Sequence, residues 1–570
     1  MQDVGESAAQ KSGGVVEMAS CSTGNAERDL HTLLDKKLGL ALPIPLSRLD
    51  TDDQTWSIPR LKLTDWLQLI VDRSLWHIMV GLRTRNRRRE ECILLEFWKH
   101  YRQLHPTHEI FQKSDSGEIQ LSRTCPIVVH GDEGRGRRRA AFMVVSFHSM
   151  LGYGIAAGDA RRKAEKVYAR MEPNFQGHTY TTRFLLGALD KKTMIQDETI
   201  FRSLMDGVAQ DCGEAISKGF RDREGVCWWA CLLHIVGDWP FLQKSGTLLR
   251  TFNNIDKKAG AKKKALPKGV CHLCRAGQIG IQYEQIGTRR PAWLATLHSE
   301  NPFRENPAFL DLPHIPHESA SIWTFDLWHS VHLGVARNFI GSVLMIYQEL
   351  EGASNIDDRF ALLSTRFHKW STENGEGCIV KKITKELLQY PSFPTATWHK
   401  GHVSTVMMRW IEHRFLNEWD DLSGHPLMKE AGEAALALNG CIREIYAAPV
   451  FLEPCLANRI AQLGLKFLRR YDALASAAQQ MSLNYFVIMP KQHAVQHLLL
   501  DLLRPAEKGI APLNPICTSV QQDEDFIGRP SRVSRRVTGR TKTIQRVLER
   551  YLKSAYSEWV NAGYILKGSR

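Results

Sequence analysis

The sequence predicts an α/β protein with a mixed sheet flanked by helices and with a large, mainly helical segment. Two apolar runs of strand length predict the sheet, because residues 126–132 and 227–238 both end in Gly-Asp. A third observation predicts the helical segment, since residues 320–500 have predominantly helical spacing. Ligands of α/β folds bind at the carboxyl ends of parallel strands. Asp132 and Asp238 therefore indicate a metal site.

The composition is that of a globular protein with a surplus of positive charge. The 570 residues are 43% hydrophobic and 24% charged, enough for a large core and more than one domain. The net charge of +14 favours nucleic acid or another polyanion as the partner. The 12 cysteines are scattered through the chain and form no disulfide framework, which predicts a reducing compartment.

Neither a membrane segment nor a secretory signal is expected. A transmembrane helix needs about 20 apolar residues, and no run in the sequence is that long. The N-terminus lacks the basic and apolar regions of a signal peptide. We therefore expect no membrane partner.

The N-terminal part is predicted to hold a tail and a small helical region. Residues 1–45 are rich in Gly, Ser, Ala and charge, which is typical of a disordered tail. Residues 46–120 have helical spacing and form the helical N-terminal region. A run of arginines at 83–89 interrupts it, either as a solvated face or as a nuclear-import or phosphate-contacting segment.

The next elements are expected to form the sheet. Strands are predicted at 125–130 and 140–147, joined by an arginine-rich turn, and a third at 180–189. A helix over 197–220 precedes the fourth strand, which ends at Asp238. This β-β-β-α-β order, with acids after the first and fourth strands, is that of ribonuclease-H-like nucleases.

Two acids at a sheet edge suit phosphodiester chemistry if a third joins them. Two Mg²⁺ or Mn²⁺ ions can activate the attacking oxygen and stabilise the leaving one. Mg²⁺ needs few protein carboxylates, because phosphate and water complete its shell. Glu524 lies in Asp523-Glu-Asp525 with arginines just beyond it. From the residues alone, these acids are either a solvated helix start or the source of the third ligand.

Several short motifs follow one another from Asp238 onward. They are Asp238-Trp-Pro, Cys271-His-Leu-Cys274, Arg289-Arg-Pro with His298, Asp326-Leu-Trp-His329, His493-Ala-Val-Gln-His497 and Glu524-Asp-Phe-Ile-Gly528. In this order they resemble the motifs of the CACTA (En/Spm-type) family of DDE transposases. Two departures are Cys-His-x-Cys for Cys-Pro-x-Cys and Asp525 where the family has Arg.

The resemblance implies a ribonuclease-H-like core, which is a mixed five-stranded sheet flanked by helices. It also implies that Asp132, Asp238 and Glu524 are the catalytic ligands of two Mg²⁺ or Mn²⁺ ions. Glu524 lies 524 − 238 = 286 residues after Asp238, so a large helical insertion must separate them. We expect the first part of the core at 121–265, the insertion at 266–480, and the last catalytic helices with a basic C-terminal segment at 481–570. Glu412 and Glu418 are rival third acids.

Cys271 and Cys274 have the spacing of half a zinc site. We expect His298 and His329 to complete a structural Zn²⁺ site in the insertion, with His314, His317 and His332 as further candidates. The alternative is a pair of reduced cysteines. His493 and His497, at i and i+4, could also bind metal, but they lack the Glu of a zinc protease motif.

Asp326 and His329, at i and i+3, lie on one face of a helix. They are either a core pair or, as the resemblance implies, support for the active site or its DNA rather than a further catalytic metal ligand.

The resemblance implies a nuclear enzyme that cleaves double-stranded DNA at transposon ends and joins it to a target, with self-association into a transpososome. A catalytically inactive, transposon-derived DNA-binding or chromatin protein is the alternative, and a nuclease without strand transfer is a third option. Several basic residues are expected to contact DNA phosphates, so the affinity for DNA should fall as the salt concentration rises. These residues are Arg135, Arg137, Arg138, Arg139, Lys262, Lys263, Lys264, Arg532, Arg535 and Arg536.

Overall fold

The computed structural model describes residues 13–51, 54–156, 171–254, 268–377, 379–537 and 543–566. Its α/β part contains a five-stranded mixed sheet in the order β5-β4-β3-β7-β6. The prediction of such a sheet is confirmed. The strands are β3 (Thr124–Arg135), β4 (Ala141–Ser149), β5 (Phe184–Asp190), β6 (Phe220–Arg221) and β7 (Cys227–Gly237).

The pairing of β3 with β7 positions the two strand-end acids. These strands are parallel, and Gly131 is in register with Gly237. A Cβ atom on Gly237 would lie 2.3 Å from the carbonyl oxygen of Gly131, and one on Gly131 would lie 2.1 Å from the ring of Phe241. Glycine is therefore required at both positions. Asp132 and Asp238 follow these glycines at neighbouring places on the sheet.

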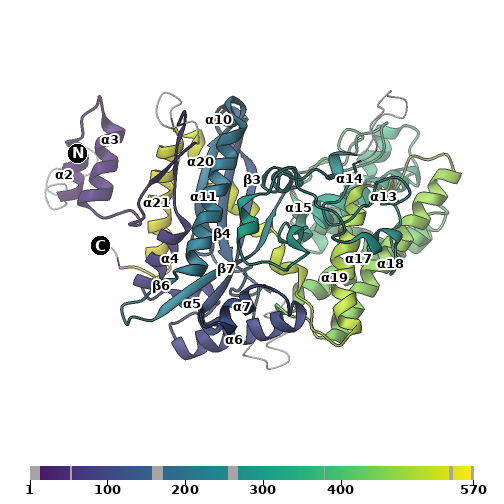
Figure 1. Ribbon diagram of the computed structural model, residues 1–570. Coiled ribbons are helices and arrows are strands. Elements are labelled where there is room, and N and C mark those ends of the chain that lie inside the picture. The colour runs from purple at the N-terminus through teal and green to yellow at the C-terminus, as the bar shows by residue number, and fades with distance from the viewer. Residues whose placement is uncertain are drawn as a thin grey trace.

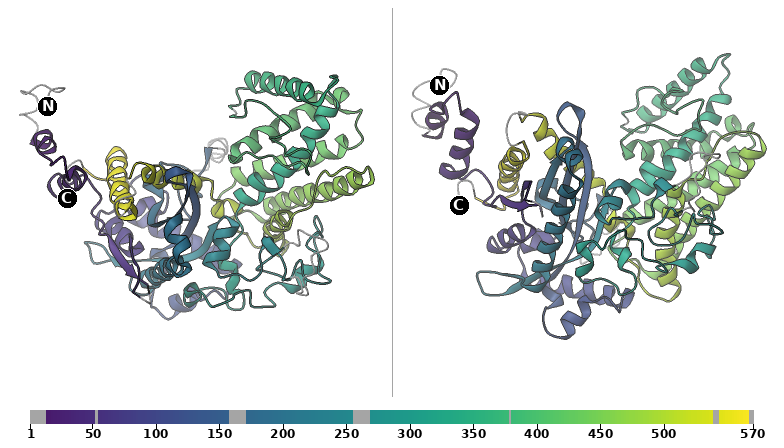
Figure 2. Two further views of the ribbon diagram at one scale, coloured as in Figure 1. Left: turned by 90° about the horizontal axis from the view of Figure 1, so that it is seen from above. Right: turned by 45° about the horizontal axis from the view of Figure 1, so that its top comes forward.

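Helices cover both faces of the sheet. On one face lie α11 (Glu198–Ser217) and α12 (Trp239–Ser245), whose Phe201 and Phe241 pack edge to face. On the other face, α20 (Gln521–Arg535) packs on β3 and β4, and α21 (Thr543–Asn561) packs on β5. Figures 1 and 2 show these two C-terminal helices, in yellow, beside the sheet. The chain thus returns to the sheet after the long helical region.

The helical region lies beside the sheet-containing part (Figure 2). Its large aromatic side chains, such as those of Phe339, Trp410 and Tyr471, are almost fully buried in one core. Helix α18 packs between α17 and α19, and α19 also contacts η8. The region contains η8 (Trp328–Val335), α13 (Ala336–Glu349), α14 (Ile356–Glu373), α15 (Gly401–Asn417), α16 (Trp419–Leu422), α17 (Met428–Ala447), α18 (Pro454–Gln480) and α19 (Pro490–Glu507).

The N-terminal part differs from the prediction in two ways. The stretch predicted as a disordered tail contains α2 (Gly13–Ala19), α3 (Ala26–Thr32) and η1 (Leu33–Lys37). Its charged residues pair with α21, since Glu27 lies 2.8 Å from Arg550 and Asp35 lies 2.7 Å from Lys553. The partners follow more than 500 positions later in the sequence, and local composition cannot reveal them.

Residues 46–120 are not entirely helical. They begin with a two-stranded antiparallel sheet, β1 (Ser47–Asp50) and β2 (Ser57–Arg60). The helices that follow are α4 (Leu63–Asp72), α5 (Trp76–Met79), α6 (Arg87–Leu104) and α7 (Ile110–Asp115). Within the described ranges, no helix combines the length and the apolar character needed to cross a membrane.

Candidate metal centres

Two acidic residues, Asp132 of β3 and Glu524 of α20, have ligand atoms within 4.8 Å of one another. A third, Asp238, directly follows Gly237 at the end of β7, where that strand pairs with β3. Asp238 caps α12, and its Oδ1 accepts the backbone N–H of Phe241 at 2.8 Å. The side chain of Glu524 is 31% exposed, whereas that of Asp132 is only 12% exposed.

Burial and neighbouring carboxylates raise the pKa of all three acids. Burial and the negative charges of Glu524 and Asp238 raise the pKa of Asp132 well above its ordinary value. Burial also raises the pKa of Asp238, with a contribution from Glu133 and Asp326, and the pKa of Glu524, with a contribution from Asp326 and Asp238. A divalent cation would relieve this repulsion, so the group is electrostatically suited to Mg²⁺ or Mn²⁺.

His329 lies in this group and not at the cysteine pair. Its Nε2 is 3.4 Å from Glu524 Oε1 and 3.9 Å from Asp132 Oδ2. Its Nδ1 is 3.1 Å from Asp326 Oδ2, and its backbone N–H donates to Asp326 Oδ1 at 2.7 Å. Burial would lower the pKa of His329, but the carboxylates of Asp326 and Asp132 raise it. Ligand atoms of Asp132, His329 and Glu524 all lie within 4.8 Å of one another.

A buried ion network fixes the helix that carries Glu524. Asp523 is fully buried, with Oδ1 at 3.0 Å from His148 Nδ1 on β4 and 3.3 Å from Arg183 Nε. These partners keep the pKa of Asp523 far below its usual value despite burial. On β3, His130 is also fully buried, and neither of its ring nitrogens has a hydrogen-bond partner. The network places the first turn of α20 over β3.

Comparison with models of known protein families gives no match, and comparison with curated proteins gives none either.

The second centre has the composition Cys2His2. Cys271 and Cys274 meet His493 and His497 of α19, with ligand atoms all within 4.8 Å and all four residues buried. The sulfur of Cys271 is 3.5 Å from His497 Nε2, and that of Cys274 is 3.4 Å from His493 Nε2. Two thiols and two imidazoles in a closed, buried group are the donor set of a structural zinc site.

The surroundings hold this second centre in place. Arg250 is buried and donates to the carbonyl oxygens of Cys271 and His272 at 3.0 and 3.1 Å. The ring of Trp293 lies 4.4 Å from each of the two imidazoles of α19, between ring centres. Hydrogen bonds and neighbouring imidazoles keep the pKa of the Cys271 thiol well below its usual value, although burial opposes this. The cysteine loop is thus prepared to present a thiolate.

The structure corrects the predicted histidine ligands of this centre. His298 and His329 were expected to join the cysteines, but His493 and His497 do. The imidazole of His298 instead lies 3.9 Å from Glu318. The sequence distance between the cysteines and α19 is no obstacle, because loop-closure entropy grows only slowly with length. The i, i+4 spacing on one helix was the available signal.

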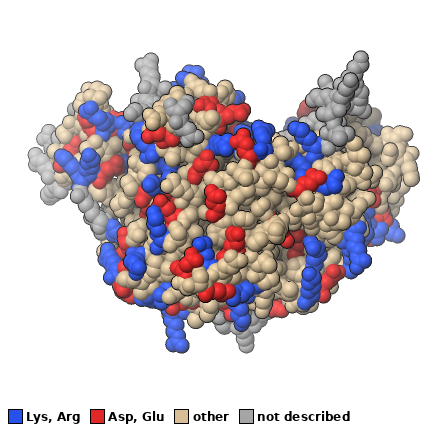
Figure 3. Space-filling view, viewed as in Figure 1, with Lys and Arg blue, Asp and Glu red and all other residues tan. Residues whose placement is uncertain are grey.

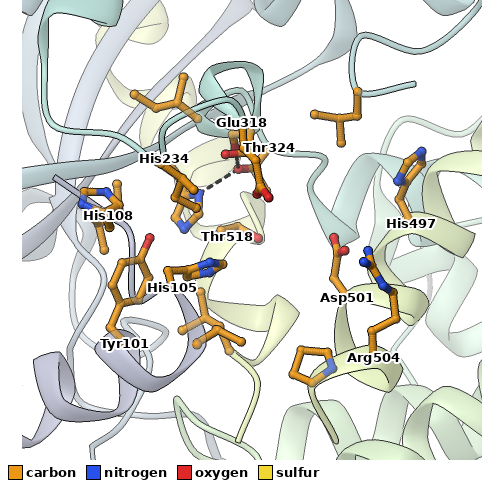
Figure 4. Close-up of a pocket in the computed structure, with 18 of the residues that line it drawn as sticks. Tyr101, His105, His108, His234, Glu318, Thr324, His497, Asp501, Arg504 and Thr518 are labelled. Carbon is orange, nitrogen blue, oxygen red and sulfur yellow. Dashed lines mark hydrogen bonds between the residues drawn. The ribbon is translucent and has the colours of Figure 1, made fainter. Parts of the chain in front are cut away.

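Three of the remaining predicted histidines line a cavity of about 830 Å³ between α6, β7 and α19. They are His298, His314 and His317. Figure 4 shows His105, His108 and His234 on one side of it and Asp501 and Arg504 on the other. His332 lies elsewhere, with Nε2 3.1 Å from the hydroxyl of Tyr446. Asp132, Asp238 and Glu524 do not line this cavity.

The rival third acids lie within the helical region. Glu412 forms an ion pair with Arg443 at 2.8 Å, and Glu418 pairs with Arg414 at 2.9 Å. Neither belongs to a potential metal group among the residues that the structure describes. Of the three candidates, Glu524 is the one that meets Asp132.

The structure brings two of the predicted basic segments together. Arg535 of α20 donates to the backbone carbonyl of Arg135 at 2.8 Å, and the turn Arg137–Arg139 also packs on α20. The predicted phosphate-contacting arginines of both segments are exposed. Lys262, Lys263 and Lys264 lie outside the described residues. On the face drawn in Figure 3, Lys and Arg are interspersed with Asp and Glu.

Proposed function

We propose that this protein is a DDE transposase-like enzyme that performs metal-dependent DNA cleavage and strand transfer. The observation that carries the proposal is that Asp132 and Glu524, from segments far apart in the sequence, have ligand atoms within 4.8 Å of one another, beside the place where β7 ends and Asp238 follows. Carboxylates that repel one another in a partly buried site have a physical rationale as a divalent-metal site. Glu524, with 31% of its side chain exposed, gives the group access to solvent.

The topology supports a ribonuclease-H-like core. The central strand β3 carries Asp132, its parallel neighbour β7 precedes Asp238, and α20 beside β3 carries Glu524. The chain between α12 and α20 would then be the helical insertion, with zinc at the Cys2His2 group as a structural ion. One departure is that β6, at the sheet edge, has two residues and runs antiparallel to β7.

The residues present fit the chemistry that such an enzyme needs. Two divalent ions, when bound, would activate the attacking oxygen and stabilise the leaving oxygen. Asp132, Asp238 and Glu524 are the residues that would hold them. The exposed arginines of residues 135–139 and of α20 would hold the phosphate backbone beside the acids. These side chains position the substrate, and their charges oppose the repulsion of an approaching polyanion.

Cleavage of DNA by the purified full-length chain tests the proposal. Supercoiled plasmid and a labelled duplex are incubated with Mg²⁺ or Mn²⁺, and nicking and joining of duplex 3′ ends to plasmid are measured. We expect a cleavage rate about 100-fold lower, or lower still, in each of the variants Asp132→Asn, Asp238→Asn and Glu524→Gln. The reason is that a bound metal ion lowers the activation barrier by several kcal/mol. Asp525→Asn is the matched control and should retain activity.

The outcomes separate the alternatives. Nicking without joining would indicate a nuclease that lacks strand transfer. DNA binding without cleavage by the wild-type chain, at any concentration of either ion, would overturn the proposal in favour of a non-catalytic DNA-binding protein. Cleavage that persists in all three acidic-residue variants would overturn the assigned site.

A further inference from the structure

We propose that His329 is a direct ligand of a divalent ion at the carboxylate centre and that Asp326 orients it. The proposal rests on the proposed metal-binding role of Asp132 and Glu524 and adds a nitrogen donor to their site. A purely carboxylate site would hold its ions through oxygen alone. The inference follows from three observations about the ring of His329.

The first observation is the orientation of the imidazole. Nδ1 of His329 faces Asp326 Oδ2 at 3.1 Å, and the same carboxylate accepts the backbone N–H of His329 at 2.7 Å. A carboxylate accepts hydrogen bonds, so Nδ1 carries the proton and donates it. Nε2 is then the nitrogen that faces the acids, and a metal ion that binds there would displace a proton from it. Metal-ligating histidines are held by a carboxylate in this manner.

The second observation is where Nε2 lies. It is 3.4 Å from Glu524 Oε1 and 3.9 Å from Asp132 Oδ2. An ion with nitrogen and oxygen bonds of about 2.0–2.2 Å fits between donors with such separations. These three residues form a compact group, whereas Asp238 is not a member of it. His329 would therefore share an ion with Asp132 and Glu524, and Asp238 would serve the other ion.

The third observation is that Asp326 has no solvent contact. It is fully buried, and both of its carboxylate oxygens bind His329. It precedes the π-helical segment η8, on which His329 is the second residue. Burying a carboxylate is costly unless its hydrogen bonds are satisfied. A histidine held so firmly, with its free nitrogen toward two carboxylates, is preorganised for a cation.

The ligand set predicts a metal preference. Mg²⁺ binds oxygen ligands, whereas imidazole suits transition metals. A site with two carboxylates and one imidazole should therefore bind Mn²⁺ more tightly than Mg²⁺. Replacing His329 should reduce this preference, because only oxygen donors would remain.

Pulsed electron paramagnetic resonance of bound Mn²⁺ tests the proposal, because a ligating imidazole gives a ¹⁴N hyperfine coupling. The full chain is first loaded with zinc to fill the Cys2His2 group, then titrated with Mn²⁺. The wild type should show ¹⁴N coupling, and His329→Gln and His329→Ala should lose it. His332→Gln, on the same segment, is the control and should keep it. Asp326→Asn should weaken Mn²⁺ affinity about 10- to 100-fold, as removal of an orienting partner does.

Each result decides between explanations. Mn²⁺ that binds in wild type, is lost in Asp132→Asn and shows no ¹⁴N coupling would overturn this inference and leave the proposed function standing. The histidine would then pair with the acids or contact substrate. Absence of Mn²⁺ binding in the zinc-loaded wild type would overturn both. Circular dichroism of the two His329 variants checks that they fold, and either folded variant suffices.

Discussion

At the scale of single residues, the strand-end acids were predictable and the histidines were not. Asp132 and Asp238 each follow an apolar run and a glycine, which predicts two strand ends, and ligands of α/β folds bind at the carboxyl ends of parallel strands. Glu524 needed the resemblance, because acids at a helix start are common on surfaces. His493 and His497 were predicted as a possible metal-binding pair but not as partners of the cysteines, because nothing local ties α19 to a cysteine loop more than 200 positions earlier.

The raised pKa values of the acids predict an unusual pH response for the metal-free protein. A carboxyl group with a raised pKa in the folded state holds its proton more tightly there than in the unfolded state. Its contribution to stability is therefore present at low pH and is lost as pH rises. Asp132→Asn removes this loss and should stabilise the metal-free protein by about 1 kcal/mol or more near neutral pH, since one pKa unit corresponds to about 1.4 kcal/mol.

Thermal unfolding across roughly pH 5 to 8 measures this effect. The advantage of the variant should grow with pH, and Mn²⁺ should raise the unfolding temperature of the wild type but not of Asp132→Asn. If Asp132→Asn were less stable than the wild type at every pH, the raised pKa assigned to Asp132 would be contradicted.

At the scale of elements, the sequence determined the type of the main strands and helices but not what they pack on. The strands at β3, β4 and β7 and the helix α11 lie within a few residues of their predicted ranges. The order of elements does not reveal that α20 covers β3. That contact depends on Gly134, where a Cβ atom would lie 2.0 Å from Ser531 Oγ and 2.8 Å from Ile527. It depends also on the ion network of Asp523.

Replacing Asp523 should destabilise α20 and displace Glu524. Asp523→Asn leaves Arg183 and His148 buried beside a neutral amide, and loss of one partner of a buried pair costs about 3–5 kcal/mol. Asp525→Asn is the control, because its carboxylate is about half exposed and pairs with Arg529, which contributes at most about 1 kcal/mol. Urea unfolding measures both, and Mn²⁺ affinity should fall only in Asp523→Asn. Equal effects of the two substitutions would contradict the role of the network.

At the scale of the whole molecule, the Cys2His2 centre links the chain after α12 to the helix that precedes the return to the sheet. The motifs indicated a long helical segment between Asp238 and Glu524, but not how its ends are joined. Long-range closure of this kind has no signature in composition or periodicity. In the structure, the cysteine loop lies against α19, which is followed after a short stretch of chain by α20.

Zinc removal should therefore affect both centres. His493→Ala and His497→Ala should lower the zinc content of the purified protein, whereas His298→Ala, at the position first expected to be a ligand, should leave it at one ion per chain. Loss of zinc should also weaken Mn²⁺ binding at the acids, because α19 leads into α20. Metal analysis together with Mn²⁺ titration measures this. Zinc loss in His298→Ala with retention in both α19 variants would reverse the assignment.

The chain is proposed to hold two separate metal centres, a carboxylate centre for divalent ions at the sheet edge and a structural zinc centre. Anomalous X-ray diffraction from crystals of the zinc-loaded protein soaked in Mn²⁺ would locate both, with data collected at the absorption edges of both metals. We expect zinc scattering among Cys271, Cys274, His493 and His497, and manganese scattering among Asp132, Asp238, Glu524 and His329. Ordered carboxylates without manganese scattering, at a saturating concentration of Mn²⁺, would contradict the proposed carboxylate centre.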